Sequence, residues 1–159
     1  MKGMRTILIV EDYDDVRGMM KVLLESENFH VLEAGSGSEA LEVIKKQRPD
    51  AILMDLALPG FDGFETIRRI RAFDGFRNIP IIVLTAYTAA STYETALSAG
   101  SNYFMAKPID FDDLLTLLKQ IFSEGNTRNL RHPRTASQRA IVKPKPLPPQ
   151  RERELRCNA

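Results

Sequence analysis

Five short runs of apolar and β-branched residues recur along the first 124 positions of the chain, and more polar stretches separate them. The runs are Thr6–Val10, Val31–Ala34, Ala51–Asp55, Ile81–Leu84 and Asn102–Met105. The first, third and fourth runs are almost continuously apolar, which is typical of parallel strands covered on both faces. The pattern therefore predicts five β-strands.

The segments between these runs have the spacing of amphipathic helices, with apolar residues at i, i+3, i+4 and i+7. One predicted helix contains Val16, Met19, Met20, Leu23 and Leu24, and we expect its methionines in the core. Another contains Phe111, Leu114, Leu115, Leu118, Ile121 and Phe122, and it begins after Asp110, a suitable N-cap residue. Shorter helices are predicted around Ala40–Ile44, Ile67–Arg71 and Ala89–Leu97.

Strands and helices thus alternate five times. This alternation favours an α/β fold, with a doubly wound five-stranded parallel sheet and right-handed crossover connections. In open sheets of this kind, ligands bind beyond the carboxyl ends of the strands. We assign residues 1–124 to this domain.

Charge divides the chain at the same place. Residues 1–124 hold 13 basic and 19 acidic side chains, whereas residues 125–159 hold 9 basic and 2 acidic ones. The second segment also contains five prolines and few large apolar residues, so we predict a basic, Pro-rich tail that is disordered or polyproline-like. The tail has no helical period, whereas sequence-specific DNA recognition by a helix-turn-helix needs packed helices, so nucleic acid is not an expected partner.

Two further features of the composition exclude whole classes of protein. No apolar run approaches the ~18 residues of a membrane-spanning helix, so no membrane association is expected. A single cysteine, Cys157, cannot form an internal disulfide or a thiolate metal cluster. Its solitary presence fits a protein of the reducing cytoplasm.

Chemically active side chains follow the predicted strands. Glu11 and Asp12 come directly after the first strand and Asp55 ends the third, while Thr85 follows the fourth strand and Lys107 follows the fifth by two residues. Three carboxylates at one edge of the sheet would repel one another unless a cation shared them, and Mg²⁺ is a suitable hard cation. With a lysine and a hydroxyl group nearby, these groups suit phosphoryl transfer to a carboxylate.

The segment Gly35-x-Gly37-x-x-Ala40 matches a dinucleotide-binding loop and suggests an alternative function. Asp55 lies 20 residues after Gly35, where a dinucleotide-binding fold has the acidic residue that binds the ribose. This loop would make the chain a small nucleotide-binding oxidoreductase. However, the motif follows the second strand instead of the first, and the domain lacks a partner domain that would hold a substrate. This alternative would also leave the acidic residues, Thr85 and Lys107 without a shared task.

Four motifs resemble those of the receiver domains of two-component response regulators, over about residues 5–123. They are Ile7-Leu8-Ile9-Val10-Glu11-Asp12, Asp55-Leu56-Ala57-Leu58-Pro59-Gly60-Phe61-Asp62-Gly63, Leu84-Thr85-Ala86 and Ala106-Lys107-Pro108. The resemblance implies a flavodoxin-like sheet with the strand order 2-1-3-4-5.

The resemblance also implies roles for individual residues. Asp55 would accept a phosphoryl group from a sensor histidine kinase or a phosphotransfer protein. Mg²⁺ would be bound by Glu11, Asp12, Asp55 and the backbone carbonyl of Ala57. Thr85 and Lys107 would contact the phosphoryl oxygens, and Thr85 and Phe104 would act as a switch.

Because only 35 residues follow the domain, we expect a receiver of the stand-alone type. The resemblance implies that it is not an enzyme beyond its own Mg²⁺-dependent phosphorylation and dephosphorylation at Asp55. Its output would pass to a downstream protein through a face formed by residues 88–122. A transcription regulator that uses the basic tail as a DNA arm stays open as an alternative. The sequence leaves the isomer of the Lys107-Pro108 bond undetermined.

Overall fold

Each apolar run of the sequence forms a strand in the computed structural model, which describes residues 3–60 and 62–124. The strands are β1 (Arg5–Val10), β2 (Phe29–Ala34), β3 (Ala51–Asp55), β4 (Ile81–Thr85) and β5 (Tyr103–Ala106). They pair in parallel in the order β2-β1-β3-β4-β5. The predicted α/β class and the flavodoxin-like strand order are therefore confirmed, and the carboxyl ends of all five strands lie at one edge.

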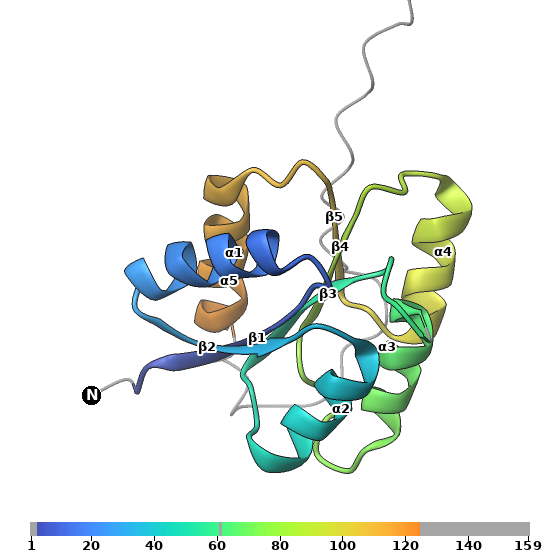
Figure 1. Cartoon of the computed structure of the whole chain (residues 1–159), viewed down its shortest axis with the longest axis horizontal. Coiled ribbons are helices and arrows are strands. Elements are labelled where there is room, and N and C mark those ends of the chain that lie inside the picture. Colours follow the sequence, from blue (N-terminus) through green and yellow to red (C-terminus); the bar gives the residue numbers. More distant parts are fainter. Residues whose placement is uncertain (1–2, 61, 125–159) are drawn as a thin grey trace, which may run out of the picture.

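A helix follows each strand. The helices are α1 (Asp14–Ser26), α2 (Gly37–Lys46), α3 (Gly63–Ala72), α4 (Ala90–Ala99) and α5 (Phe111–Glu124). Helices α1 and α5 cover one face of the sheet, and α2, α3 and α4 cover the other (Figure 1). The sheet is thus the middle of three layers, as the nearly continuous apolar runs indicate.

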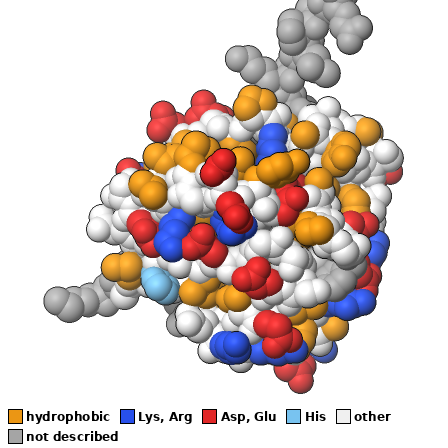
Figure 2. All heavy atoms as spheres, in the orientation of Figure 1, with side chains coloured by type: hydrophobic (Ala, Val, Ile, Leu, Met, Phe, Trp, Pro, Cys, Tyr) orange, Lys and Arg blue, Asp and Glu red, His pale blue; other side chains and the backbone are white. Residues whose placement is uncertain are grey.

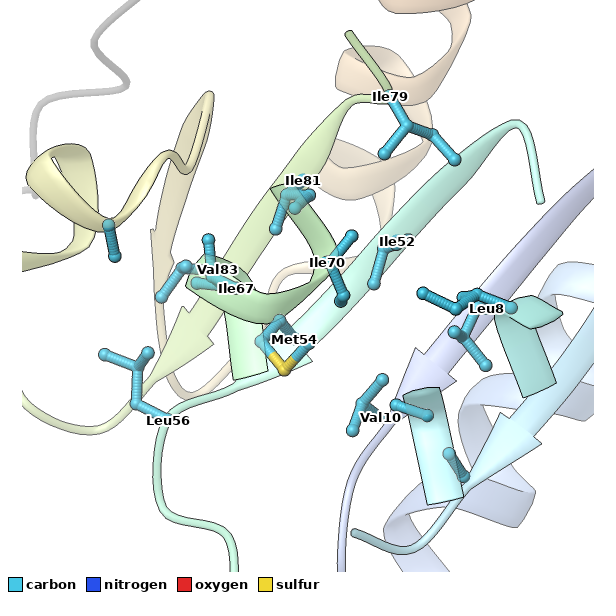
Figure 3. Close-up of a cluster of buried hydrophobic side chains, with 14 of the residues drawn as sticks. Leu8, Val10, Ile52, Met54, Leu56, Ile67, Ile70, Ile79, Ile81 and Val83 are labelled. Atoms are coloured by element: carbon cyan, nitrogen blue, oxygen red, sulfur yellow. The ribbon is translucent and has the colours of Figure 1, made fainter. Parts of the chain in front are cut away.

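The two faces of the sheet carry separate apolar clusters because side chains alternate along a strand. Leu8, Ile52 and Val83 face the layer of α2 and α3, where Ile67 and Ile70 pack against them (Figure 3). Their strand neighbours face α1 and α5. Full burial of a Leu or Ile side chain contributes about 1.5–3 kcal/mol, so these two clusters hold the strand ends in place.

Four of the five strands differ from the predicted bounds by one or two residues: β1 and β2 begin earlier, at Arg5 and Phe29. β4 includes Thr85, and β5 runs one residue later than expected, so Lys107 follows its strand directly. Asn102, the predicted first residue of this strand, lies just before β5, and its side chain binds α3 and β4. Its Oδ1 atom accepts hydrogen bonds from the backbone N–H of Ile81 at 2.9 Å and from Nη2 of Arg71 at 2.7 Å.

Side-chain caps fix where three of the helices begin. Oδ1 of Asp110 accepts two backbone N–H groups of the first turn of α5, as predicted. Asp62 caps α3 through the N–H of Glu65 at 2.9 Å, and Ser36 caps α2 through the N–H of Glu39. Each such cap contributes about 1 kcal/mol.

The face drawn in Figure 2 has hydrophobic side chains among acidic and basic ones. The exposed large apolar side chains of the described residues are Met4, Tyr13, Met19, Val22 and Tyr87. The prediction that both methionines of α1 lie in the core is therefore wrong for Met19, which is 57% exposed, and right for Met20. The apolar stripe of α1 is wider than the strip of helix surface that the sheet and α5 cover.

The tail predicted for residues 125–159 lies outside the described residues, and it stays a prediction. Within residues 3–60 and 62–124, no helix combines the length and the apolar character that crossing a lipid bilayer requires.

Candidate functional site

The structure brings together side chains from three strand ends. The Nζ atom of Lys107, after β5, lies 2.7 Å from Oε2 of Glu11, after β1, and 2.8 Å from Oδ2 of Asp55, at the end of β3. Glu11 and Asp55 are almost completely buried. An ammonium group thus bridges two buried carboxylates that are far apart in the sequence.

Asp12 completes an acidic cluster with these two residues. Glu11, Asp12 and Asp55 each offer a carboxylate oxygen, and the three oxygens lie within 4.8 Å of one another. Among the described residues, Oδ1 of Asp12 is buried and lacks a hydrogen-bond partner. Three carboxylates and one ammonium group carry a net charge of −2, which a divalent cation would neutralise. The oxygen-only donor set and the unpartnered oxygen fit a hard cation such as Mg²⁺.

The environment changes the proton affinity of two members of the site. Burial raises the pKa of Glu11 above its ordinary value, and the charge of Asp55 adds to the rise, although the hydrogen bond from Lys107 opposes it. Burial works against the charged form of Lys107, but hydrogen bonds to Asp55 and Glu11 outweigh it and raise its pKa. Lys107 therefore stays protonated at neutral pH and serves as a permanent positive charge.

The loop after β3 holds the other oxygen of the central carboxylate. Oδ1 of Asp55 accepts a hydrogen bond from the backbone N–H of Ala57 at 3.0 Å. The loop folds back on itself, since the N–H of Gly63 donates to the carbonyl of Leu56 at 3.1 Å. Both oxygens of Asp55 are therefore oriented by donors from this chain.

Thr85 and Phe104 occupy two neighbouring strands. Thr85 is fully buried, and its Oγ1 atom accepts the backbone N–H of Tyr87 at 3.0 Å. Its carbonyl accepts the N–H of Lys107 at 2.8 Å, across the β4–β5 pair. Phe104 lies in the core with its ring edge-on to Tyr93 of α4, at 5.6 Å between centroids. The peptide bond between Lys107 and Pro108 is cis.

Sequence reasoning missed one residue beside the site. Nη1 of Arg17, in α1, donates to the backbone carbonyl of Glu11 at 2.7 Å. An arginine on a polar helix face is ordinary, so the sequence contained no signal for this contact.

The glycines of the alternative dinucleotide loop lie elsewhere. Gly35 and Gly37 follow β2, which is an edge strand, and the N–H of Gly35 donates to Oε2 of Glu39 at 2.6 Å. The motif therefore follows β2 and not β1, the strand that Glu11 follows.

Similarity to known proteins identifies the class of protein that has this fold and this cluster of acidic residues. The family model described as response regulator receiver domain matches residues 7–119. Sporulation initiation phosphotransferase F of Bacillus subtilis is 32% identical over 114 residues, which cover 72% of this chain and 90% of that protein.

Solved structures agree with this family. A putative response regulator from Chloroflexus aurantiacus is 37% identical, with a TM-score of 0.71 over 76% of this chain and 98% of that one. The receiver domain of the sensor histidine kinase PA1611 from Pseudomonas aeruginosa is 36% identical, with a TM-score of 0.71 over 76% of this chain and 99% of that one. That structure is described as having a magnesium ion coordinated in its active-site cleft.

The chain belongs to the response regulator receiver domain family. It is a phosphoryl-accepting signalling domain of two-component phosphorelays. Receiver domains interact with histidine kinases or phosphotransfer proteins. This membership does not favour the oxidoreductase alternative or the alternative of a transcription regulator with a DNA arm.

Proposed function

We propose that Asp55 is the residue that accepts the phosphoryl group, from a sensor histidine kinase or a phosphotransfer protein. The observation that carries this proposal is the position of Asp55 at the centre of the acidic edge. One of its oxygens contacts the ammonium group of Lys107, and the other contacts the N–H of Ala57. A carboxylate so oriented, with a fixed positive charge beside it, is prepared to act as a nucleophile.

In the proposed reaction, an oxygen of Asp55 attacks the phosphorus atom and an O–P bond forms. The bond from phosphorus to the donor breaks, and its electron pair leaves with the imidazole of a phosphohistidine or with another leaving group. Lys107 and the hydroxyl of Thr85 would bind the phosphoryl oxygens, where they stabilise the negative charge of the transition state. Hydrolysis of the aspartyl phosphate returns Asp55, and we propose no enzymatic activity beyond this cycle.

The proposed Mg²⁺ ligands are the carboxylates of Glu11, Asp12 and Asp55 and the backbone carbonyl of Ala57. Support comes from the clustered carboxylate oxygens and from the buried, unpartnered Oδ1 of Asp12. When bound, the ion would neutralise charge on both the carboxylates and the incoming phosphate. Lys107 alone leaves the cluster with an excess of negative charge, which disfavours the approach of an anionic donor.

We further propose that phosphorylation switches a protein-binding face formed by residues 88–122, through Thr85 and Phe104. The contact between the rings of Phe104 and Tyr93 supports this, because it connects β5 to α4. A change at Thr85 that moved the ring of Phe104 would alter the packing of α4, and a partner would then prefer one arrangement. The downstream partner would be a protein and not nucleic acid, and the single cysteine supports a cytoplasmic location.

Incubation with acetyl phosphate and Mg²⁺, followed by intact-mass measurement, tests the proposed acceptor. The expected result is the gain of one phosphoryl group, which Asp55→Asn or chelation of the metal abolishes. Asp74→Asn is the matched control, because Asp74 is an exposed aspartate between α3 and β4, and it should be phosphorylated like the wild type. A normal gain of phosphate by Asp55→Asn would overturn the assignment.

A further inference from the structure

Arg17 connects three segments beside the acidic cluster. It lies in the first turns of α1, and its side chain is only 18% exposed. Its Nη1 atom donates to the carbonyl of Glu11 at 2.7 Å, and its Nη2 atom lies 2.6 Å from Oδ1 of Asp14. Its Nε atom lies 3.5 Å from Oε1 of Glu33, in β2. The guanidinium group thus joins the end of β1, the start of α1 and the end of β2.

The contact with Glu11 fixes the peptide group between the two neighbouring acids. The N–H of Glu11 donates to the carbonyl of Ala34 at 3.1 Å, in continuation of the β1–β2 pairing. The carbonyl of Glu11 accepts the hydrogen bond from Nη1 of Arg17. Because the peptide group is planar, the orientation of this carbonyl is tied to the backbone torsions on either side of it, and the contact with Arg17 restrains these torsions between Glu11 and Asp12.

Arg17 is itself held in place. Its Nη2 atom pairs with the carboxylate of Asp14, and its Nε atom pairs with the carboxylate of Glu33. The third nitrogen, Nη1, binds the carbonyl of Glu11. Glu33 is anchored in turn by Nζ of Lys21 at 2.5 Å. A planar guanidinium can serve three acceptors in fixed directions, whereas a lysine ammonium in the same place would be a point charge on a flexible stem.

Gly35 provides the space for this arrangement. A Cβ atom at position 35 would lie 3.3 Å from Nη1 of Arg17 and 3.4 Å from Oε2 of Glu39. The first is closer than most Cβ contacts, so any side chain here would press on the donor that holds Glu11. The glycine that resembles part of a dinucleotide-binding loop in the sequence thus lies against Arg17, and a Cβ atom there would require Nη1 to shift by a few tenths of an ångström.

We propose that Arg17 is a positioning residue for metal binding: by holding the Glu11 carbonyl, it sets the two adjacent carboxylates in the directions that Mg²⁺ requires. This inference rests on the proposed function of the acidic cluster as an Mg²⁺ site. Arg17 acts through the backbone and contacts neither the metal nor the phosphoryl group. Groups that orient metal ligands in this way typically account for about 10- to 100-fold in metal affinity.

The experiment is a calorimetric titration of the full-length protein with Mg²⁺, without any phosphoryl donor. Arg17→Met keeps the apolar stem and loses all donors, so we expect Mg²⁺ to bind about 10- to 100-fold more weakly. Arg17→Lys keeps the charge and loses the fork of donors, and we expect a loss of the same order. Lys45→Met is the matched control, since Lys45 also pairs with an acid three residues away on a helix, and its affinity should be unchanged.

A second measurement separates positioning from a general effect on folding. The initial rate of phosphorylation by acetyl phosphate is followed as a function of Mg²⁺ concentration. For Arg17→Met the half-saturating Mg²⁺ concentration should rise by the same factor as the dissociation constant, while the rate at saturation stays near that of the wild type. A merely structural role would lower the rate at saturation and leave the half-saturating concentration in place.

The possible outcomes are distinct. Wild-type affinity in Arg17→Met, or full recovery of affinity in Arg17→Lys, overturns the positioning role and leaves the proposed function intact. Failure of the wild type to bind Mg²⁺ overturns both. If Arg17→Met does not fold, Arg17→Lys decides the question, because it keeps the positive charge and the apolar stem and loses only the planar fork of donors. A severalfold weaker Mg²⁺ affinity supports the proposal, and wild-type affinity overturns it.

Discussion

A methyl group added at Gly63 should disturb the proposed acceptor directly. Gly63 is the first residue of α3, and a Cβ atom there would lie 2.4 Å from the carbonyl oxygen of Asp55 and 2.7 Å from Cα of Leu56. Real Cβ atoms essentially never approach other heavy atoms below 3.0 Å. The backbone torsions of Gly63 suit other residues, so space alone excludes a side chain here.

The size of the effect follows from these distances. Reaching an ordinary contact of 3.4 Å requires a shift of about 1 Å between the start of α3 and the end of β3. Overpacking of this kind costs about 1–3 kcal/mol, and the reduced flexibility of the unfolded chain returns about 0.4–1 kcal/mol. We therefore expect Gly63→Ala to lower the free energy of unfolding by about 1–2 kcal/mol, which corresponds to a loss of about 4–8 °C in Tm for a domain of this size.

The same shift moves the Asp55 carboxylate relative to Lys107. A misplacement of about 1 Å can lower a reaction rate by about 100-fold, so phosphorylation by acetyl phosphate should slow well beyond the loss of folded protein. Thermal unfolding and the mass-based phosphorylation assay measure the two effects. Gly18→Ala is the control, because nothing lies within 4 Å of its added Cβ in α1, and it should stabilise the domain by about 0.5–1 kcal/mol. The reasoning fails if Gly63→Ala is as stable and as readily phosphorylated as Gly18→Ala.

Three further predictions concern the site and its supports. Burial raises the pKa of Glu11 above 4.5, so the folded, metal-free domain binds this proton more tightly than the unfolded chain. Wild-type stability should therefore gain, relative to Glu11→Gln, as the pH falls toward 4.5, and unfolding curves with the same pH dependence would contradict this. Tyr87 is exposed beside Thr85, where its ring would shield an aspartyl phosphate from water. Tyr87→Ser should shorten the phosphoryl lifetime severalfold in a mass-based time course, and an unchanged lifetime would count against shielding. Asp110→Ala removes the cap of α5 and should cost about 1 kcal/mol in urea unfolding, which an unchanged midpoint would refute.

The central strands were the most predictable part of the fold. Both ends of β3 agree with the sequence-based prediction, because all five of its residues are buried and form one apolar run. β2 begins at Phe29, earlier than predicted, because it is an edge strand and its early residues include the exposed His30. On α1, periodicity could not separate Met19 from Met20, since the extent of the covering layer decides which of the two is buried.

The convergence of the acidic residues was also predictable, because parallel strands bring their carboxyl ends to one edge of the sheet. The sequence could not show that Lys107 spans Glu11 and Asp55, which depends on the path of a flexible side chain. The contact of Arg17 with the Glu11 backbone was equally hidden. It depends on how α1 packs beside β2, and spacing along the chain does not encode that packing.

The attachment of α4 to the rest of the domain has a consequence for motion. Its buried residues are Ala96 and Ala99, its start lacks a side-chain cap, and it ends at Gly100 in the left-handed conformation. Two methyl groups and the contact between the Tyr93 and Phe104 rings stabilise this attachment only weakly, since each buried CH₂ group contributes about 0.8 kcal/mol. Amide protons of α4 should accordingly exchange with deuterated solvent before those of α5, whose inner face is lined with leucines. Of the two helices in the proposed output face, α4 is thus the one that can detach from the domain at the lower cost in free energy.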